Sequence, residues 1–219
     1  MAKSLIEKFD CSNCKNSCCV STDKYLGVAC LSALLEHLSD YEFYDSGNGL
    51  GAVYIGNFEL AEIIEVDYKV GVRIKHDGCA LLDDNGLCKV HDKVLMPGSI
   101  LAENFKIIGL DNAVKPFTCR AYPYEYDYDS GRVIKNINCS DELEDRIIEV
   151  PGHTKLARQA KKRKKLNDIT CNILAKTWGG EGRNPIMDII YVLREYRLPK
   201  AWPKYLFDKV LERVGAKTF

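Results

Sequence analysis

The pattern of apolar and polar positions begins with a helical repeat. After Thr22-Asp23, a pair suited to cap a helix, apolar side chains recur every three or four residues. This spacing predicts a helix that runs through about Leu38. The apolar positions on its stripe are Leu26, Ala29, Cys30, Ala33, Leu34 and Leu38. Because Cys30 falls on the stripe, we interpret it as a small buried thiol of the core and not as a metal ligand.

Strand patterns dominate the middle of the chain. The VGVRIK run at 70–75 alternates as a half-buried strand does, and the glycine-rich stretch at 47–51 predicts a turn before the strand-like run AVYIG. Two short apolar runs flank Asn85-Gly86, the strongest hairpin signal in the sequence. A second hairpin is predicted from RAYPYEYDY and RVIKNIN, around a turn at 129–131.

Beyond Pro151 the pattern becomes helical. Helical spacing and prolines suited to a first helical turn predict three helices, at about 154–178, 184–197 and 203–214. Cys171 lies among apolar residues of the first of them. Like Cys30, it is interpreted as a core residue and not as a ligand.

Charge is distributed unevenly along the chain, although its 219 residues carry a formal net charge of zero. Residues 1–150 contain 15 Lys and Arg against 25 Asp and Glu, whereas residues 151–219 contain 16 against 6. The two parts therefore attract one another. This predicts either that the C-terminal part docks on the N-terminal part, or that a separate basic surface faces an acidic partner.

Location and redox state affect how the ten cysteines are interpreted. No apolar run is long enough to cross a bilayer, and the N-terminal MAKSLIEKFD carries charges where a signal peptide is apolar. We therefore expect a cytoplasmic protein that does not contact membranes. In a reducing compartment, so many cysteines favour metal binding over disulfide bonds, with a set of buried thiols as the alternative.

Four cysteines lie close together near the start of the chain, at Cys11, Cys14, Cys18 and Cys19. A loop with this spacing brings the first three to one point, and soft thiolate ligands favour zinc or an iron–sulfur cluster over magnesium or calcium. Neighbouring side chains of an extended segment point to opposite faces. The adjacent pair therefore makes a second metal centre, or a bridge between two centres, plausible.

The hairpins constrain four later cysteines. If Asn85 and Gly86 are the central turn residues, Cys88 faces Asp83, and Cys79 lies roughly 13 Å further along the strand. A regular hairpin thus cannot place both thiols on one ion, so either the run is irregular or the two thiols serve different metal positions. The second predicted hairpin would bring Cys119 and Cys139 near the same end, as a shared or adjoining metal site requires.

These motifs together resemble a known family. The segments CSNCKNSCC, GCALLDDNGLCKVHD and KPFTCRAYPY are similar to those of the CxxCxxCC family of zinc- or iron-chelating proteins, the YkgJ-like group. The resemblance covers roughly residues 8–140. Residue by residue it implies eight thiolate ligands, namely Cys11, Cys14, Cys18, Cys19, Cys79, Cys88, Cys119 and Cys139.

The chain departs from the family pattern at three places. His91 stands where the family has tyrosine, Lys115 replaces the arginine before Pro116, and 92–114 is an insertion between two segments that the family keeps close. His91 could add a nitrogen ligand, but we interpret it as a polar residue near the site. Eight thiolates already complete two four-coordinate centres.

The cofactor follows from the ligands and from the resemblance. Eight thiolates would build two four-cysteine units, either zinc ions or [4Fe-4S] clusters, or a single cluster with the other cysteines unligated or acting on a substrate. A family relative, the flagellin lysine N-methylase, is similar in its cysteine motif and is associated with an iron–sulfur cluster. The resemblance therefore implies one or two iron–sulfur clusters, with zinc as the alternative.

Three functions are compatible with this pattern. The first is an iron–sulfur protein that transfers electrons, delivers a cluster or assists another enzyme, in which Arg120 faces the site beside Cys119. The second is a zinc-stabilised module that contacts RNA or an acidic protein through the seven basic residues of 155–165, which otherwise form a solvated helix face. The third, an enzyme, has no convincing base or nucleophile, so its catalytic residues are unknown.

We therefore predict an α+β fold with two parts. Residues 1–150 would form a cysteine-pinned, antiparallel β metal-binding domain with an N-terminal helix. Residues 151–219 would form a helical basic extension that packs on it.

Overall fold

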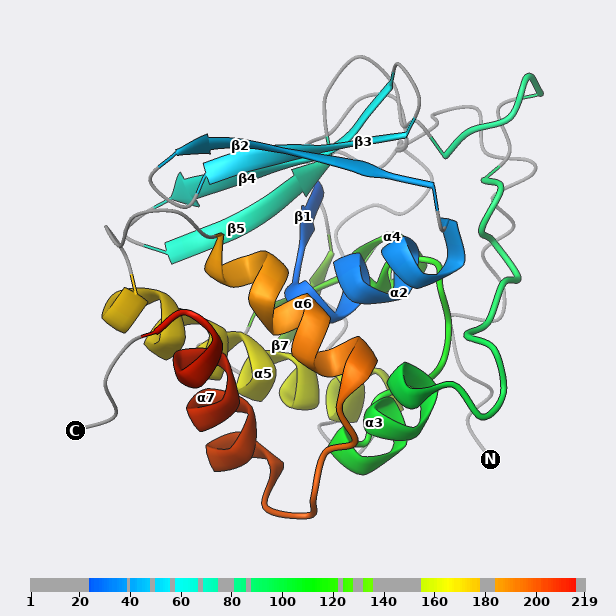
Figure 1. Cartoon of the computed structure of the whole chain (residues 1–219). Coiled ribbons are helices and arrows are strands. Elements are labelled where there is room, and N and C mark those ends of the chain that lie inside the picture. Colours follow the sequence, from blue (N-terminus) through cyan, green and yellow to red (C-terminus); the bar gives the residue numbers. More distant parts are fainter. Residues whose placement is uncertain are drawn as a thin grey trace.

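The computed structural model describes the parts of the chain that carry regular structure and their shorter connections (Figure 1). These are residues 24–38, 40–47, 50–55, 58–66, 69–74, 81–85, 88–121, 124–127, 132–135, 155–177 and 184–215. Within them, helices and antiparallel sheets occupy separate parts of the molecule, so the predicted α+β class is confirmed. The boundary predicted at residue 150 lies outside the described residues.

A five-stranded antiparallel sheet forms one layer of the molecule, in the order β1-β5-β4-β3-β2. Its strands are β1 (Lys24–Leu26), β2 (Glu42–Gly47), β3 (Leu50–Ile55), β4 (Phe58–Val66) and β5 (Lys69–Ile74). β5 is the strand predicted from VGVRIK. The predicted glycine turn lies between β2 and β3, where the register shifts between Asp45 and Gly47. β3 contains the strand-like run AVYI, whereas β1, β2 and β4 were not predicted and extend the sheet beyond the two strands seen in the sequence.

The second predicted hairpin is confirmed as a separate two-stranded sheet. Its strands are β6 (Tyr124–Asp127) and β7 (Arg132–Lys135), and the last described pair before the turn joins Asp127 to Arg132. Cys119 precedes β6 in the short helix α4 (Phe117–Ala121), whereas Cys139 lies outside the described residues.

Three of the four predicted helices agree closely with the structure, namely α5 (Lys155–Thr177), α6 (Pro185–Glu195) and α7 (Trp202–Arg213). The helix predicted after Thr22-Asp23 begins later than expected, as α2 (Val28–Leu38), because Leu26 lies in strand β1 and not on the helix. Asn184 caps α6 by accepting hydrogen bonds from the backbone N–H groups of Ile186 and Met187. None of the described helices is both long and apolar enough to cross a membrane.

One helix was missed within the segment interpreted as an insertion. α3 (Ile100–Ile108) begins at Ser99, whose hydroxyl accepts from Ala102 N, and ends at Gly109, which adopts a left-handed φ of 86°. Its partner in the core is fixed by Asn104, a fully buried residue. The Asn104 amide donates to Leu193 O and Tyr196 O and accepts from Leu198 N. These three bonds hold α3 against the C-terminal end of α6.

The helices pack under the sheet around one continuous apolar core (Figure 1). Residues from both parts of the chain contribute to it; its largest fully buried side chains are Phe105, Leu31, Leu34, Leu35, Leu60, Leu101, Ile108, Leu166, Ile173, Ile186 and Ile189. The described C-terminal helices therefore share a core with α2 and α3. This matches the alternative in which the basic part of the chain docks on the acidic part.

Candidate functional site

The structure describes two of the eight predicted thiolate ligands, Cys88 and Cys119, and both are partly buried. The other six, Cys11, Cys14, Cys18, Cys19, Cys79 and Cys139, lie outside the described residues. Among the residues that are described, no group of three or more His, Cys, Asp or Glu side chains could hold a metal ion. The fit of a metal centre is therefore tested on the surroundings of Cys88 and Cys119.

A short antiparallel pairing lies between Cys88 and Cys119 in the sequence. Val94 and Ala113 form an isolated antiparallel bridge, flanked by hydrogen bonds from Leu95 N to Asn112 O and from Val114 N to Lys93 O. Cys88 precedes this bridge by six residues, and Cys119 follows it by six, within helix α4. The residues between 92 and 114, interpreted as an insertion, thus fold back and return the chain to the region of Cys88.

A contact between side chains continues this pairing toward the cysteines. Lys115 Nζ lies 2.8 Å from His91 Nδ1, and Lys115 is only 6% exposed. Since an ammonium group only donates, Nδ1 is the acceptor and the ring proton belongs on Nε2, 3.8 Å from Asp92 Oδ1. Two positions at which the chain departs from the CxxCxxCC pattern that its sequence resembles therefore contact one another. His91 fits the predicted role of a polar neighbour, with its Nδ1 already engaged.

The hairpin around Asn85 differs from the prediction. Cys88 pairs with Leu82 and not with Asp83, because Asp83 Oδ1 accepts a hydrogen bond from Asn85 N and widens the turn. After Cys88 the chain turns again, with His91 N donating to Cys88 O. The run is irregular, which is one of the two alternatives that the cysteine spacing left open.

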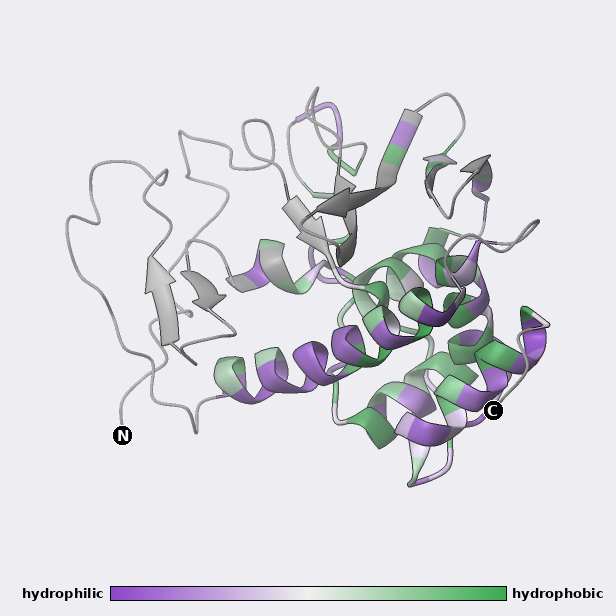
Figure 2. Cartoon of the chain, turned by 90° about the vertical axis from the view of Figure 1, so that its left-hand side faces the viewer, coloured by the Kyte–Doolittle hydropathy of each residue, from purple (hydrophilic) through white to green (hydrophobic). Residues whose placement is uncertain are grey.

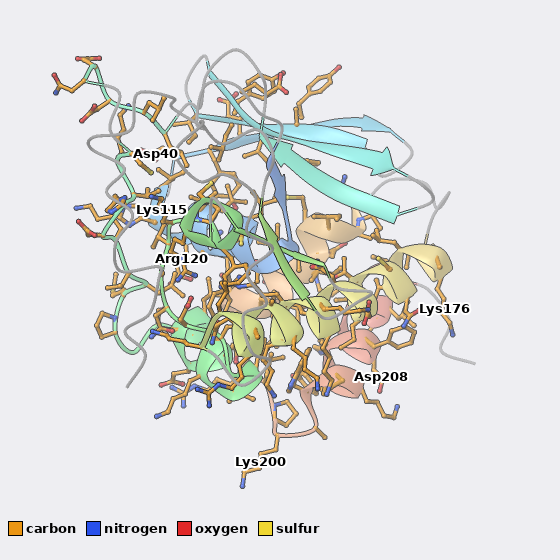
Figure 3. All side chains as sticks on the ribbon, turned by 180° about the vertical axis from the view of Figure 1, so that it is seen from behind. Asp40, Lys115, Arg120, Lys176, Lys200 and Asp208 are labelled. Atoms are coloured by element: carbon orange, nitrogen blue, oxygen red, sulfur yellow. The ribbon has the colours of Figure 1, made fainter. Side chains whose placement is uncertain are left out.

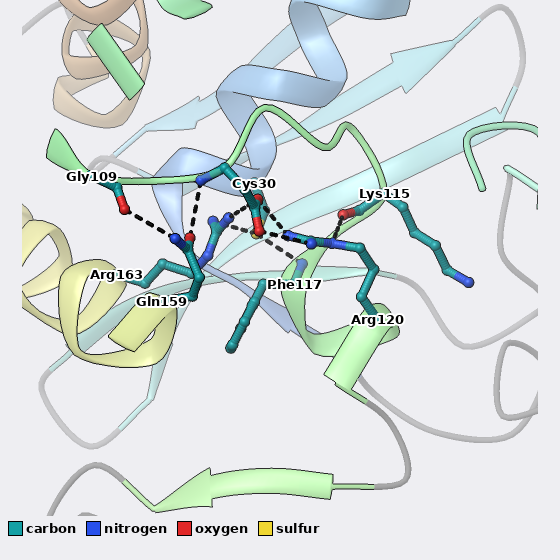
Figure 4. A network of polar contacts seen from close by, with 8 residues as sticks. Cys30, Gly109, Lys115, Phe117, Arg120, Gln159 and Arg163 are labelled. Carbon is teal, nitrogen blue, oxygen red and sulfur yellow. Dashed lines mark hydrogen bonds and ion pairs between the residues drawn. The ribbon is translucent and has the colours of Figure 1, made fainter. Parts of the chain in front are cut away.

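Helix α4, which carries Cys119, is held by a polar cluster centred on Asp111 (Figure 4). The Asp111 carboxylate accepts two hydrogen bonds from Arg120, at 2.9 and 2.7 Å, and one from Arg163 of α5, at 3.3 Å. Arg120 Nε also donates to Lys115 O at 3.0 Å. Arg120 was predicted to face the metal site; its guanidinium is instead committed to Asp111 and to the backbone before α4.

Burial and charge act in opposite directions on the Asp111 carboxyl. Burial favours its neutral form and would raise its pKa, but the hydrogen bond and charge of Arg120, with the charges of Arg163 and Lys155, outweigh burial. The pKa of Asp111 is therefore lowered from its ordinary value. The carboxylate stays ionised between two arginines at neutral pH.

Cys30 belongs to the same polar cluster, and here the sequence missed a contact. The residue is 5% exposed, which confirms its predicted place in the core. Its sulfur also accepts hydrogen bonds from Phe117 N and Arg163 Nη1, both at 3.4 Å. The Phe117 ring lies 5.0 Å from the Arg163 guanidinium and 5.8 Å from that of Arg120. α2, α4 and α5 are thus joined at one point.

The cluster also reaches the end of α3. Gln159 of α5 donates to Gly109 O and accepts from Asp111 N, both at 3.0 Å. In Figure 4, Gly109 and Gln159 lie on one side of the cluster, with Lys115 and Arg120 on the other. In the view of Figure 3, Lys115 and Arg120 lie near one another, away from Lys200 and Asp208.

A separate cavity of about 390 Å³ lies along α6, beside the start of β2 and the end of α7. Its charged groups are partly paired within the protein. Arg213 Nε donates to Asp188 Oδ1 at 2.8 Å and stacks on Tyr191, and Arg194 donates to the Tyr41 hydroxyl at 3.0 Å. Asp188 Oδ2 and Arg194 Nε are buried without a hydrogen-bond partner among the described residues. Burial would lower the pKa of Arg213, but the hydrogen bond and charge of Asp188 raise it. No described cysteine is among the lining residues.

Comparison with known protein families, with curated proteins and with solved structures finds no match in any of the three. The similarity to the CxxCxxCC family stays a prediction that depends on the cysteine motifs.

Proposed function

We propose that this protein is a metal-binding protein that carries one or two iron–sulfur clusters, of the [4Fe-4S] type, on eight cysteine thiolates. The ligands in this proposal are Cys11, Cys14, Cys18, Cys19, Cys79, Cys88, Cys119 and Cys139. A bound cluster would supply one-electron chemistry, for electron transfer, for cluster delivery or in support of another enzyme. The alternative is zinc in a structural role, which the same ligands could bind. We assign no catalytic residue.

One observation carries this proposal: the bridge between Val94 and Ala113 and the contact of Lys115 with His91 bring the chain that leads to Cys119 back to the chain that follows Cys88. These cysteines are 31 positions apart in sequence, and the 92–114 segment could have separated them in space. Its return toward Cys88 is the behaviour expected if both thiols serve one centre or two adjoining centres.

A second support is the way in which α4 is anchored. Metal ligands bind best when the backbone that presents them is already fixed by packing and hydrogen bonds. Arg120 ties α4 to Asp111, and Phe117 N at its start donates to Cys30.

Anaerobic purification followed by metal, acid-labile sulfide and visible absorbance measurements tests the proposal. Iron and sulfide in comparable amounts, with visible absorbance that bleaches on reduction, are expected. A colourless protein with stoichiometric zinc would replace the cluster by the zinc alternative. Protein that binds neither metal, or that contains disulfides between these cysteines, would contradict both.

Single serine variants then test the two described ligands. We expect Cys88→Ser and Cys119→Ser each to lower the bound iron and sulfide per chain, because serine does not replace a thiolate in such a centre. Cys171→Ser on α5 is the matched control, since it removes one partly buried thiol from outside the motif. Equal metal content in all three variants and the unchanged protein would exclude Cys88 and Cys119 as ligands.

A further inference from the structure

The basic segment at the start of α5 divides into residues that hold the fold and residues that do not. Arg163 is buried against Asp111, and Lys164 pairs with Asp168 at 3.0 Å, four residues along the same helix. Lys165 lies 5.6 Å from the Trp202 ring. The remaining four basic residues of this segment are exposed and form no ion pair with any described residue; they are Lys155, Arg158, Lys161 and Lys162. We refer to these four residues as the α5 basic face.

The α5 basic face lies on the side of the helix opposite the core. The buried residues of this part of α5 are Leu156, Ala157, Ala160, Arg163 and Leu166. Figure 2 shows hydrophilic residues along the outward side of this helix. At 1.5 Å per residue, the stretch from Lys155 to the exposed Lys165 extends about 15 Å.

Helix α5 itself adds to the positive electrostatic potential at the α5 basic face. Its first turn contains no acidic residue, and Asp168 is the only acidic residue in all of α5. The N-terminal end of a helix carries a partial positive charge, so Lys155 and Arg158 stand where cations are least favourable for the helix. The Asp111 carboxylate attracts Lys155 within the protein. Helix stability does not explain the position of Arg158, which attraction to an external anion would explain.

The surface lacks what a protein partner requires. Stable protein interfaces are centred on exposed apolar or aromatic side chains. The exposed large apolar residues among those described are Tyr44, Val94, Met96, Ile107 and Tyr191, and none of them is on α5. A nucleic-acid backbone requires no apolar centre, because counterion release on phosphate neutralisation supplies the affinity.

We propose that the α5 basic face binds the phosphodiester backbone of a nucleic-acid duplex without reading its sequence. Binding to single strands normally uses aromatic side chains on which bases stack, and no exposed aromatic residue is described on α5. A duplex presents one charge per ~1.7 Å of its axis, so about six phosphate charges lie along the roughly 10 Å of helix from Lys155 to Lys162. This inference is independent of the metal.

The test measures the salt dependence of binding of the full-length protein to a labelled duplex RNA of mixed sequence, with duplex DNA, single-stranded RNA and poly-glutamate as the other probes. If four phosphates are neutralised, the slope of log affinity against log salt is about −3.6, and affinity falls roughly 100-fold between 50 and 200 mM salt. We expect duplex RNA to bind more tightly than single-stranded RNA or poly-glutamate in the same salt.

Two triple variants that remove the same number of positive charges distinguish binding by the α5 basic face from an effect of the protein's net charge. Arg158→Gln, Lys161→Gln and Lys162→Gln together should reduce the slope by about 2.7, to near −0.9. The control combines Lys200→Gln, Lys204→Gln and Lys209→Gln, which removes three lysines from before and within α7, two of them paired with Asp208 and Glu212. It should leave the slope unchanged. Circular dichroism establishes that both variants are folded.

Three outcomes would overturn the proposal. If the slope falls by the same amount in both triple variants, binding depends only on net charge. If the slope is unchanged in the Arg158, Lys161 and Lys162 variant, the α5 basic face does not contact the duplex. Poly-glutamate competing as well as duplex RNA would point to an acidic protein.

Discussion

Asp111→Asn is the substitution that most directly tests how the polar cluster stabilises the fold. Asp111 is the only carboxylate described within 4 Å of Arg120 and Arg163. The asparagine side chain is nearly the same size, so the cavity stays filled while the negative charge is removed. The amide N–H₂ group also replaces one acceptor oxygen, and it cannot accept a hydrogen bond from the guanidinium groups that it faces.

The expected loss follows from the exposure of the three side chains. Arg163 is 7% exposed, Asp111 19% and Arg120 27%, so water screens Arg120 more than Arg163. Removing one partner of a fully buried pair costs about 3–5 kcal/mol, whereas an exposed pair contributes less than about 1 kcal/mol. For this intermediate case we expect the free energy of unfolding to fall by about 2–3 kcal/mol at pH 7.

Urea denaturation of the two proteins, followed by circular dichroism, measures this difference. Adding Arg163→Met to Asp111→Asn should restore part of the loss, because it removes the buried charge that has lost its partner. Asp168→Asn is the control, since it breaks the exposed pair with Lys164 and should cost well under 1 kcal/mol. A cost for Asp111→Asn no larger than that of the control, or a further large loss in the double variant, would refute the reasoning.

The same pair of proteins makes a prediction about pH. The pKa of Asp111 is lowered in the folded protein, so its stabilisation is complete above the ordinary pKa of 3.8 and is lost as the pH falls through the folded value. The difference in stability between the protein and Asp111→Asn should be constant from pH 7 to about 5, and should shrink below about 4. A difference that grows on acidification would contradict the sign of this pKa shift.

Four further substitutions have effects that urea denaturation can measure. Asn104→Ala removes the side-chain partner of three backbone groups, two of them buried, and should cost about 3 kcal/mol; a cost below about 1 kcal/mol would mean that α3 and α6 are not joined there. Asn184→Ala removes the cap of α6 and should cost about 1 kcal/mol, with Ser99→Ala giving a similar loss at α3. Gly109→Ala should also cost about 1 kcal/mol, because residue 109 has a positive φ. The neighbouring Lys162 side chain leaves room for a methyl group, so a steric clash adds little. An unchanged stability would contradict the left-handed conformation.

The three C-terminal helices were predicted almost to the residue because their signals are local. Asn184-Pro185 is both a cap and a first turn, and the apolar period of α5 continues without interruption. α3 carries comparable signals in Ser99 and Gly109. It was missed because the region was compared with a family pattern that lacks it, and so was interpreted as an insertion.

The contacts of the site could not be predicted in the same way. Arg163 lies 52 positions from Asp111 and 133 from Cys30, and no periodic pattern relates such distant polar residues. The pairing of Cys88 was wrong by one position because an aspartate side chain took the N–H of Asn85. The two-residue turn was predicted from backbone geometry alone. A side chain that accepts a hydrogen bond from the backbone can change the length of the turn.

Asp111 gives the basic segment of α5 and the cysteine segment of α4 a common support. Arg163 and Arg120 approach the same carboxylate from two elements, and each also lies near the Phe117 ring. Because Arg163 points into the core, its helix is fixed in rotation, and Lys155, Arg158, Lys161 and Lys162 are directed outward. Asp111, which neutralises Arg163, therefore also fixes the helix rotation that leaves the four residues of the α5 basic face at the surface. A loss of the Asp111 cluster should therefore weaken both the anchoring of Cys119 and the orientation of the α5 basic face.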